Sequence, residues 1–73
     1  MSVATTRRFE FVGGSSSKFW EIQTNGCEVI IRFGRIGTSG QSSVKTFPNQ
    51  DAADKFAAGV IRQKLAKGYH EIG

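Results

Sequence analysis

The sequence has little of the chemistry that enzymes, metal proteins and secreted proteins use. Its 73 residues include one cysteine, Cys27, and one histidine, His70. A single cysteine cannot form an internal disulfide and does not provide the paired spacing of a zinc or thiol redox site. Neither residue has an evident partner for nucleophilic or acid-base catalysis. We therefore expect Cys27 to be a small core residue, His70 to be a surface residue, and the chain to have no catalytic residue, no metal and no other cofactor.

Long hydrophobic runs are also missing. The longest are a few residues long, whereas a helix needs about 20 apolar residues to cross a bilayer, and the N-terminus lacks the apolar stretch of a signal peptide. We therefore expect a cytoplasmic protein with no membrane contact. Residues 1–73 have room for a single domain, and a hydrophobic content of 38% with six Phe, one Trp and one Tyr is enough for a small core.

Acidic residues are absent from the middle of the chain. The whole chain contains ten Lys and Arg against six Asp and Glu, a net charge of +4. Between Glu28 and Asp51 there is no acid, but Arg32, Arg35 and Lys45 fall in this stretch. Proteins contact phosphate mainly through Arg, Lys, small polar side chains and backbone N–H groups. The stretch also supplies such polar side chains: Thr38, Ser39, Gln41, Ser42, Ser43 and Thr46. It is a candidate phosphate-binding surface.

Alternating apolar and polar residues predict an antiparallel sheet of about four strands. Residues 1–6 have no such pattern and are expected to form a frayed lead-in. Asn25-Gly26 is a dipeptide that favours a tight hairpin, so the strands on either side of it should pair. Glycines at 34, 37 and 40 predict a loop or bulge where the backbone makes a close approach or needs positive φ. The expected strands are residues 7–12, 18–23, 27–33 and 41–47.

The last third of the sequence predicts one helix. Asn49 is a candidate N-cap, and Gly68 is a candidate left-handed C-cap. Apolar residues at helical spacing form one stripe that should lie on the sheet, and Tyr69 and Ile72 should fold back onto the core. The stripe consists of Ala53, Phe56, Ala57, Val60, Ile61 and Leu65. The predicted fold class is α+β, a small antiparallel sheet with one C-terminal helix packed on it.

Two interpretations are open for Phe33. It ends its strand just before Gly34 and Arg35, so an aromatic ring and a guanidinium could emerge together and hold an open nucleic-acid end by stacking and charge. Alternation instead places Phe33 on the apolar face of its strand, and by itself this favours a core position. The glycines that follow are equally compatible with simple turns and with a phosphate loop.

Residues 33–41, Phe-Gly-Arg-Ile-Gly-Thr-Ser-Gly-Gln, resemble the Trp-Gly-Arg signature of the WGR domain. This domain is found in the DNA-dependent poly(ADP-ribose) polymerases and in small bacterial proteins. Lys-Phe-Trp-Glu-Ile at 18–22 is similar to the aromatic strand that precedes the motif, and residues 47–68 are similar to the domain's helix. The resemblance covers roughly residues 9–72 and implies the same small sheet with one helix.

The resemblance also implies a role at DNA ends. In the polymerases the aromatic residue of the motif packs against the sugar at a 5′ terminus, and neighbouring polar and basic groups contact phosphate. These roles carry over to Phe33, Gly34 and Arg35. Phe33 replaces the tryptophan of the motif, which keeps a stacking ring but removes the indole N–H donor.

We therefore expect a non-catalytic nucleic-acid-binding module that contacts the DNA phosphate backbone or strand ends, including 5′ ends and breaks, without sequence specificity. The expected binding residues are Phe33, Gly34, Arg35, Gln41, Lys45 and Arg32. Such a protein could associate with the nucleoid. The alternative is an adaptor that uses the same motif surface to bind a partner protein.

Overall fold

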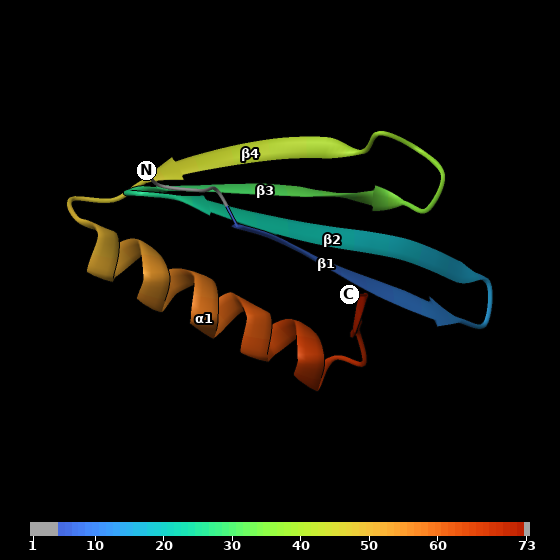
Figure 1. Ribbon diagram of the computed structural model, residues 1–73. Helices are drawn as coiled ribbons and strands as arrows, with labels where there is room; N and C mark the ends of the chain where they lie inside the picture. The colour runs from blue at the N-terminus through green and yellow to red at the C-terminus, as the bar shows by residue number, and fades with distance from the viewer. Residues whose placement is uncertain (1–4, 73) are drawn as a thin grey trace.

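Residues 5–72 are described by the computed structural model, and they form one antiparallel sheet with a helix lying across one face (Figure 1). The order across the five-stranded sheet is β4-β3-β2-β1-β5. The predicted α+β class is confirmed. The elements in chain order are β1 (Thr5–Gly13), β2 (Ser16–Asn25), β3 (Glu28–Arg35), β4 (Gln41–Thr46), α1 (Gln50–Ala66) and β5 (His70–Ile72).

The predicted hairpin between β2 and β3 is present, but its turn lies one residue later than expected. Asn25 pairs with Glu28, so the two turn residues are Gly26 and Cys27. Gly26 has a φ of 63°, a backbone conformation that residues with a side chain rarely adopt. Cys27 therefore belongs to the turn and not to β3, and it is partly buried instead of lying in the core.

The strand prediction was wrong at both ends of the described chain. Thr5 and Thr6 pair with β2 and belong to β1, so they are not a frayed lead-in, while residues 1–4 of that prediction lie outside the described residues. β5 was missed because three residues are too few to show an alternating pattern. It pairs antiparallel with β1 and leaves His70 exposed, as expected.

The hydrophobic core lies between the sheet and α1. Phe9, Trp20 and Val29 project from neighbouring strands and meet Ala53 and Ala57 of the helix. The rings of Phe9 and Trp20 lie 5.7 Å apart between centroids, within the range of favourable aromatic contacts. The small side chains of the two alanines allow the helix to lie close to these rings. Tyr69 packs against this core as predicted.

Two residues predicted to join the core are exposed. Leu65 is 49% exposed because the inward position in the last turn of α1 is taken by Lys64, whose Nζ lies 5.5 Å from the centre of the Trp20 ring. Ile72 is 48% exposed because it pairs with Arg8, which alternates with Phe9 and so faces away from the helix.

Both predicted helix caps are confirmed. The side chain of Asn49 accepts a hydrogen bond from the backbone N–H of Ala52 at 2.8 Å. Gly68 follows the helix with a φ of 100°. The chain therefore turns sharply after α1 and leads into β5, which pairs with β1 (Figure 1).

Candidate nucleic-acid interface

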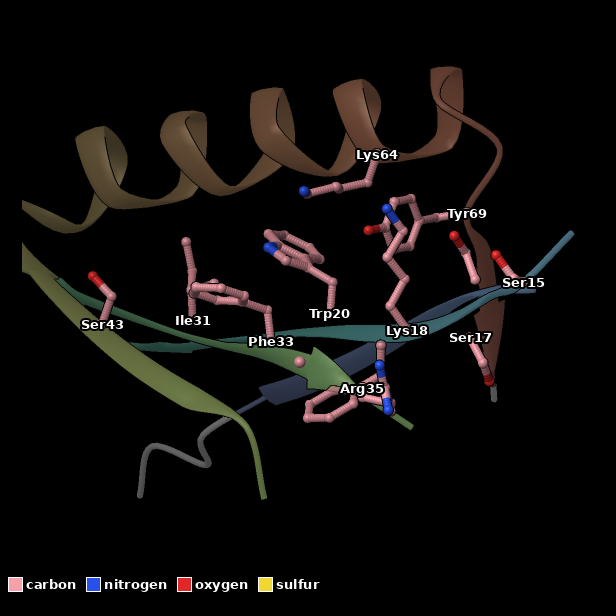
Figure 2. A pocket seen from close by; sticks show the side chains of 13 residues that line it. Ser15, Ser17, Lys18, Trp20, Ile31, Phe33, Arg35, Ser43, Lys64 and Tyr69 are labelled. Carbon is pink, nitrogen blue, oxygen red and sulfur yellow. The ribbon is translucent and has the colours of Figure 1, made fainter. Parts of the chain in front are cut away.

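A groove of about 590 Å³ opens between the sheet and the end of α1 (Figure 2). Trp20, Ile31 and Phe33 rise from the sheet toward the helix, and Lys64 and Tyr69 close the opposite wall. Ser15 of the β1–β2 turn and Ser16, Ser17 and Lys18 at the start of β2 form one end. None of the described residues that line the groove is acidic. The lining consists of Ser15, Ser16, Ser17, Lys18, Phe19, Trp20, Ile31, Phe33, Gly34, Arg35, Ser43, Lys64 and Tyr69.

Three cations share this groove. Lys18 and Arg35 are direct cross-strand neighbours, an arrangement in which like charges repel. Figure 2 shows Lys18 rising from the sheet toward the end of α1 and Lys64 extending from the helix over Trp20, whereas Arg35 lies at the edge and is turned away from the helix. Burial lowers the pKa of Lys64, and the nearby Lys67 and Lys18 lower it further. An anion bound beside these side chains would offset both the repulsion between the cations and the cost of burying the Lys64 charge.

Lys64 is held on aromatic surfaces. Its Nζ lies 5.1 Å from the ring centre of Tyr69 and 5.5 Å from that of Trp20, both within cation–π range. This ammonium has no carboxylate partner among the described residues. The aromatic rings therefore fix the position of the charge without neutralising it.

The motif glycines are required by close backbone contacts. A side-chain carbon added to Gly34 would lie 2.8 Å from the Cα of Gly40, and one added to Gly40 would lie 2.4 Å from the carbonyl oxygen of Phe33. Gly40 also has a positive φ of 70°. The hydroxyl of Thr38 donates to the carbonyl of Arg35 at 2.7 Å and tightens the turn. The predicted loop with positive φ and close backbone approach is confirmed.

Phe33 combines the features expected from both interpretations. It shares the helix-facing side of β3 with Val29 and Ile31, as alternation predicted. Its side chain is nevertheless 44% exposed, because it lies at the rim of the groove beyond the reach of the core. A little under half of the ring is therefore available to a ligand.

The six residues predicted to bind nucleic acid do not share one surface. Phe33, Gly34 and Arg35 line the groove, and Gln41 pairs with Phe33 on the same face of the sheet. Lys45 lies on that face but farther along β4, where its Nζ is 5.6 Å from the ring of Phe56. Arg32 faces the opposite side of the sheet, where it bonds to Glu21 and to the carbonyl of Ser39. The acid-free stretch is therefore not one continuous cationic surface.

Sequence reasoning missed part of the groove. Lys18 could have been found from the hairpin register, since that register places it opposite Arg35. Lys64 follows Val60 by four residues and Ile61 by three, so helical spacing puts it on the buried stripe. Tyr69 and Ser15 come from connecting segments, whose positions relative to the sheet cannot be read from periodicity.

Residues 5–72 contain no group of three or more His, Cys, Asp or Glu residues placed to hold a metal ion. Within the same range, no helix is both long enough and apolar enough to cross a membrane.

Comparison with known proteins places these features in a family. A family model of the WGR domain matches residues 5–73. Protein YehF of Escherichia coli K12 is 38% identical over 65 residues, and the uncharacterized protein YfeS of the same strain is 34% identical over 65 residues; each match covers 89% of this chain. The chain spans 24% and 27% of the length of these relatives. These matches indicate no catalytic family.

A solved structure shows the same fold. The crystal structure of a Bacteroides fragilis protein is similar to this chain with a TM-score of 0.92 and 40% sequence identity. The similarity covers 94% of this chain and 20% of that protein.

Proposed function

The chain belongs to the WGR domain family, and from this premise we propose that it is a non-catalytic nucleic-acid-binding module that holds DNA phosphates and strand ends in the groove. The observation that supports this most directly is the composition of the groove. Lys18, Arg35 and Lys64 line it together with the partly exposed Phe33, and no described acidic side chain lines it.

Each part of the groove has a role in this proposal. The exposed part of the Phe33 ring stacks on a sugar or base, which is accessible at a strand end but not inside an intact duplex. Lys18, Lys64 and Arg35 contact the adjacent phosphates, and the serine hydroxyls and Gln41 supply further hydrogen bonds. A strand that continued along β4 would also meet Lys45. Arg32 is not included, because it faces the other side of the sheet.

Sequence specificity is not expected from this arrangement. Phosphate contacts fix the register of a protein on DNA but do not read the bases, and stacking accepts any base because every base has a π-face. The groove therefore suits a module that recognises the form of a nucleic acid, such as an end or a break, at any sequence. A protein with this activity would associate with the nucleoid.

A titration at several salt concentrations tests the proposal. Labelled duplex with free ends and a covalently closed duplex of the same sequence are titrated between about 50 and 200 mM salt. Three phosphate contacts give a log-log slope of roughly −3, and the duplex with free ends should bind more tightly. Lys18→Ala and Lys64→Ala should each reduce the slope by about 1.

Lys55→Ala is the matched control. Lys55 lies on α1 outside the groove and is 3.2 Å from Asp51, so its loss removes the same charge without removing a groove cation. This variant should bind like the unmodified protein. A response that does not depend on salt, or an equal loss in Lys55→Ala, would exclude phosphate binding in the groove.

The second candidate is a protein-interaction adaptor that uses the same surface. It is supported by the apolar floor of the groove and by the exposed rim residue Phe33, since aromatic side chains are enriched at the centres of protein interfaces. An absence of DNA binding, combined with salt-insensitive capture of a protein through Phe33, would favour this alternative.

A further inference from the structure

We infer that Arg32 is a positioning residue, which holds the motif loop at residues 36–40 from the face of the sheet opposite the groove. Its effect on DNA binding rests on the proposed function, but its effect on the loop does not. The inference replaces the expectation that Arg32 contacts phosphate directly.

The first support is the burial of Phe19 on the face that the helix does not cover. This ring is only 1% exposed. The guanidinium of Arg8 lies 4.5 Å from the ring centre and that of Arg32 lies 5.1 Å from it. Both cations are within cation–π range, so the two arginines act as the cover that a helix provides on the other face.

The second support is the carboxylate between the two arginines. Glu21 accepts from Arg8 Nη1 at 2.7 Å and from Arg32 Nε at 3.0 Å, using a different oxygen for each. Burial raises the pKa of Glu21, but the hydrogen bonds from Arg8 and Arg32 outweigh it and leave this pKa below its ordinary value. Glu21 therefore fixes the orientation of the Arg32 guanidinium on the sheet.

The third support is the direct contact with the loop. Arg32 Nη1 donates to the backbone carbonyl of Ser39 at 3.2 Å. The next residue, Gly40, packs so closely that an added side-chain carbon would lie 2.8 Å from the Phe19 ring. The loop is thus attached to a rigid unit made of Phe19, Glu21 and Arg32.

This unit affects the groove because the loop that it holds packs against Phe33 and Gly34 of the motif. Gly40 lies against the carbonyl of Phe33, and Gly34 lies against the Cα of Gly40, so a displaced loop would remove the support of the strand end that presents Phe33 and Arg35. Arg32 already uses Nε, Nη1 and Nη2 in these contacts. A lysine at this position retains the charge but has a single ammonium, which cannot reproduce the planar fork.

Amide hydrogen exchange in the free protein tests the effect on the loop. The reporters are the backbone N–H groups of Ile36, bonded to Ser17 at 3.0 Å, and of Thr38, bonded to Arg35 at 3.1 Å. Arg32→Lys should increase their exchange rates by about tenfold while the amides of β1 keep theirs. Arg8→Ala is the control, because it removes a cation from the same Phe19 ring but leaves the bond from Arg32 to Ser39.

DNA titration of the same variants separates positioning from direct contact. Arg32→Lys should lower affinity by about tenfold with an unchanged salt slope, and Arg8→Ala should stay within about threefold. If Arg32 instead touched phosphate, the lysine variant would bind normally and Arg32→Met would reduce the slope by about 1. Arg32→Met is also the second variant for exchange if Arg32→Lys folds poorly, because its unbranched side chain still covers Phe19.

The inference is overturned if both Arg32 variants leave the exchange rates of Ile36 and Thr38 unchanged, or if Arg32→Lys retains full affinity. If the unmodified protein binds no DNA, the proposed function fails, and the exchange rates alone decide whether Arg32 positions the loop.

Discussion

Replacing Phe33 with alanine separates a binding role from a structural role. Full burial of a phenylalanine side chain contributes roughly 1.5–3 kcal/mol to stability. Phe33 is 44% exposed, so its buried part should contribute about 1–1.5 kcal/mol. In a domain of this size such a loss lowers the melting temperature by about 5–10 °C, which leaves the protein folded at 25 °C. Stacking of the exposed part on a strand end is worth roughly 1–3 kcal/mol, so affinity should fall by about one to two powers of ten.

The assay pairs circular-dichroism melts with titrations of free-ended and closed duplexes. Phe33→Ala should lose most of the preference for free ends while remaining folded. Val44→Ala is the control, because Val44 is also exposed, at 57%, but lies outside the groove. This variant should change neither the melting temperature nor the DNA affinity much. If Phe33→Ala costs about 3 kcal/mol or more of stability and the remaining folded protein binds normally, Phe33 is a core residue and stacking is refuted.

Four further outcomes follow. Trp20→Ala should lower the free energy of unfolding by roughly 3–5 kcal/mol, because the indole is only 3% exposed, and a melt close to that of the unmodified protein would contradict this. Arg35→Ala should weaken DNA binding and lower the salt slope by about 1 with little change in melting temperature. The pKa of Glu21 in the folded protein is below the ordinary 4.5, so the stability that Glu21 contributes is present above pH 4.5 and is lost as the pH falls through the folded-state pKa. In Glu21→Gln the free energy of unfolding should therefore depend less on pH in this acidic range. The pKa of Lys64 is below 10.5 and should rise when phosphate binds beside it. DNA binding at alkaline pH should therefore be coupled to the uptake of a proton, which calorimetry in different buffers measures. Lys64→Arg should abolish this uptake.

Much of the fold could be predicted from local patterns. The faces of β2 and β3 agree with the alternation of their residues, since Trp20 and Ile22 share the side that packs on the helix with Val29. Asn49 and Gly68 marked the ends of the helix through ordinary capping chemistry. β5 could not be predicted, since its pairing with β1 depends on where the turn after the helix directs the chain.

The site was less predictable than the fold. The motif at Phe33, Gly34 and Arg35 could be located because it is contiguous in sequence. Lys64 is separated from Lys18 by most of the chain, and only the packing of α1 on the sheet brings the two together. Arg32 was grouped with Phe33 and Arg35 by charge along the sequence, although alternation puts Arg32 and Phe33 on opposite sides of β3.

Chemical-shift mapping with a free-ended duplex tests the central claim most directly. Amide and side-chain signals of the isotopically labelled protein are followed as DNA is added. The proposed function predicts that the largest changes occur at Lys18, Phe33, Arg35, Lys64 and the indole N–H of Trp20, while Glu10 and Gln23 on the opposite face stay nearly unchanged. Changes centred on that opposite face, or no changes at all, would contradict the proposal that the groove binds DNA.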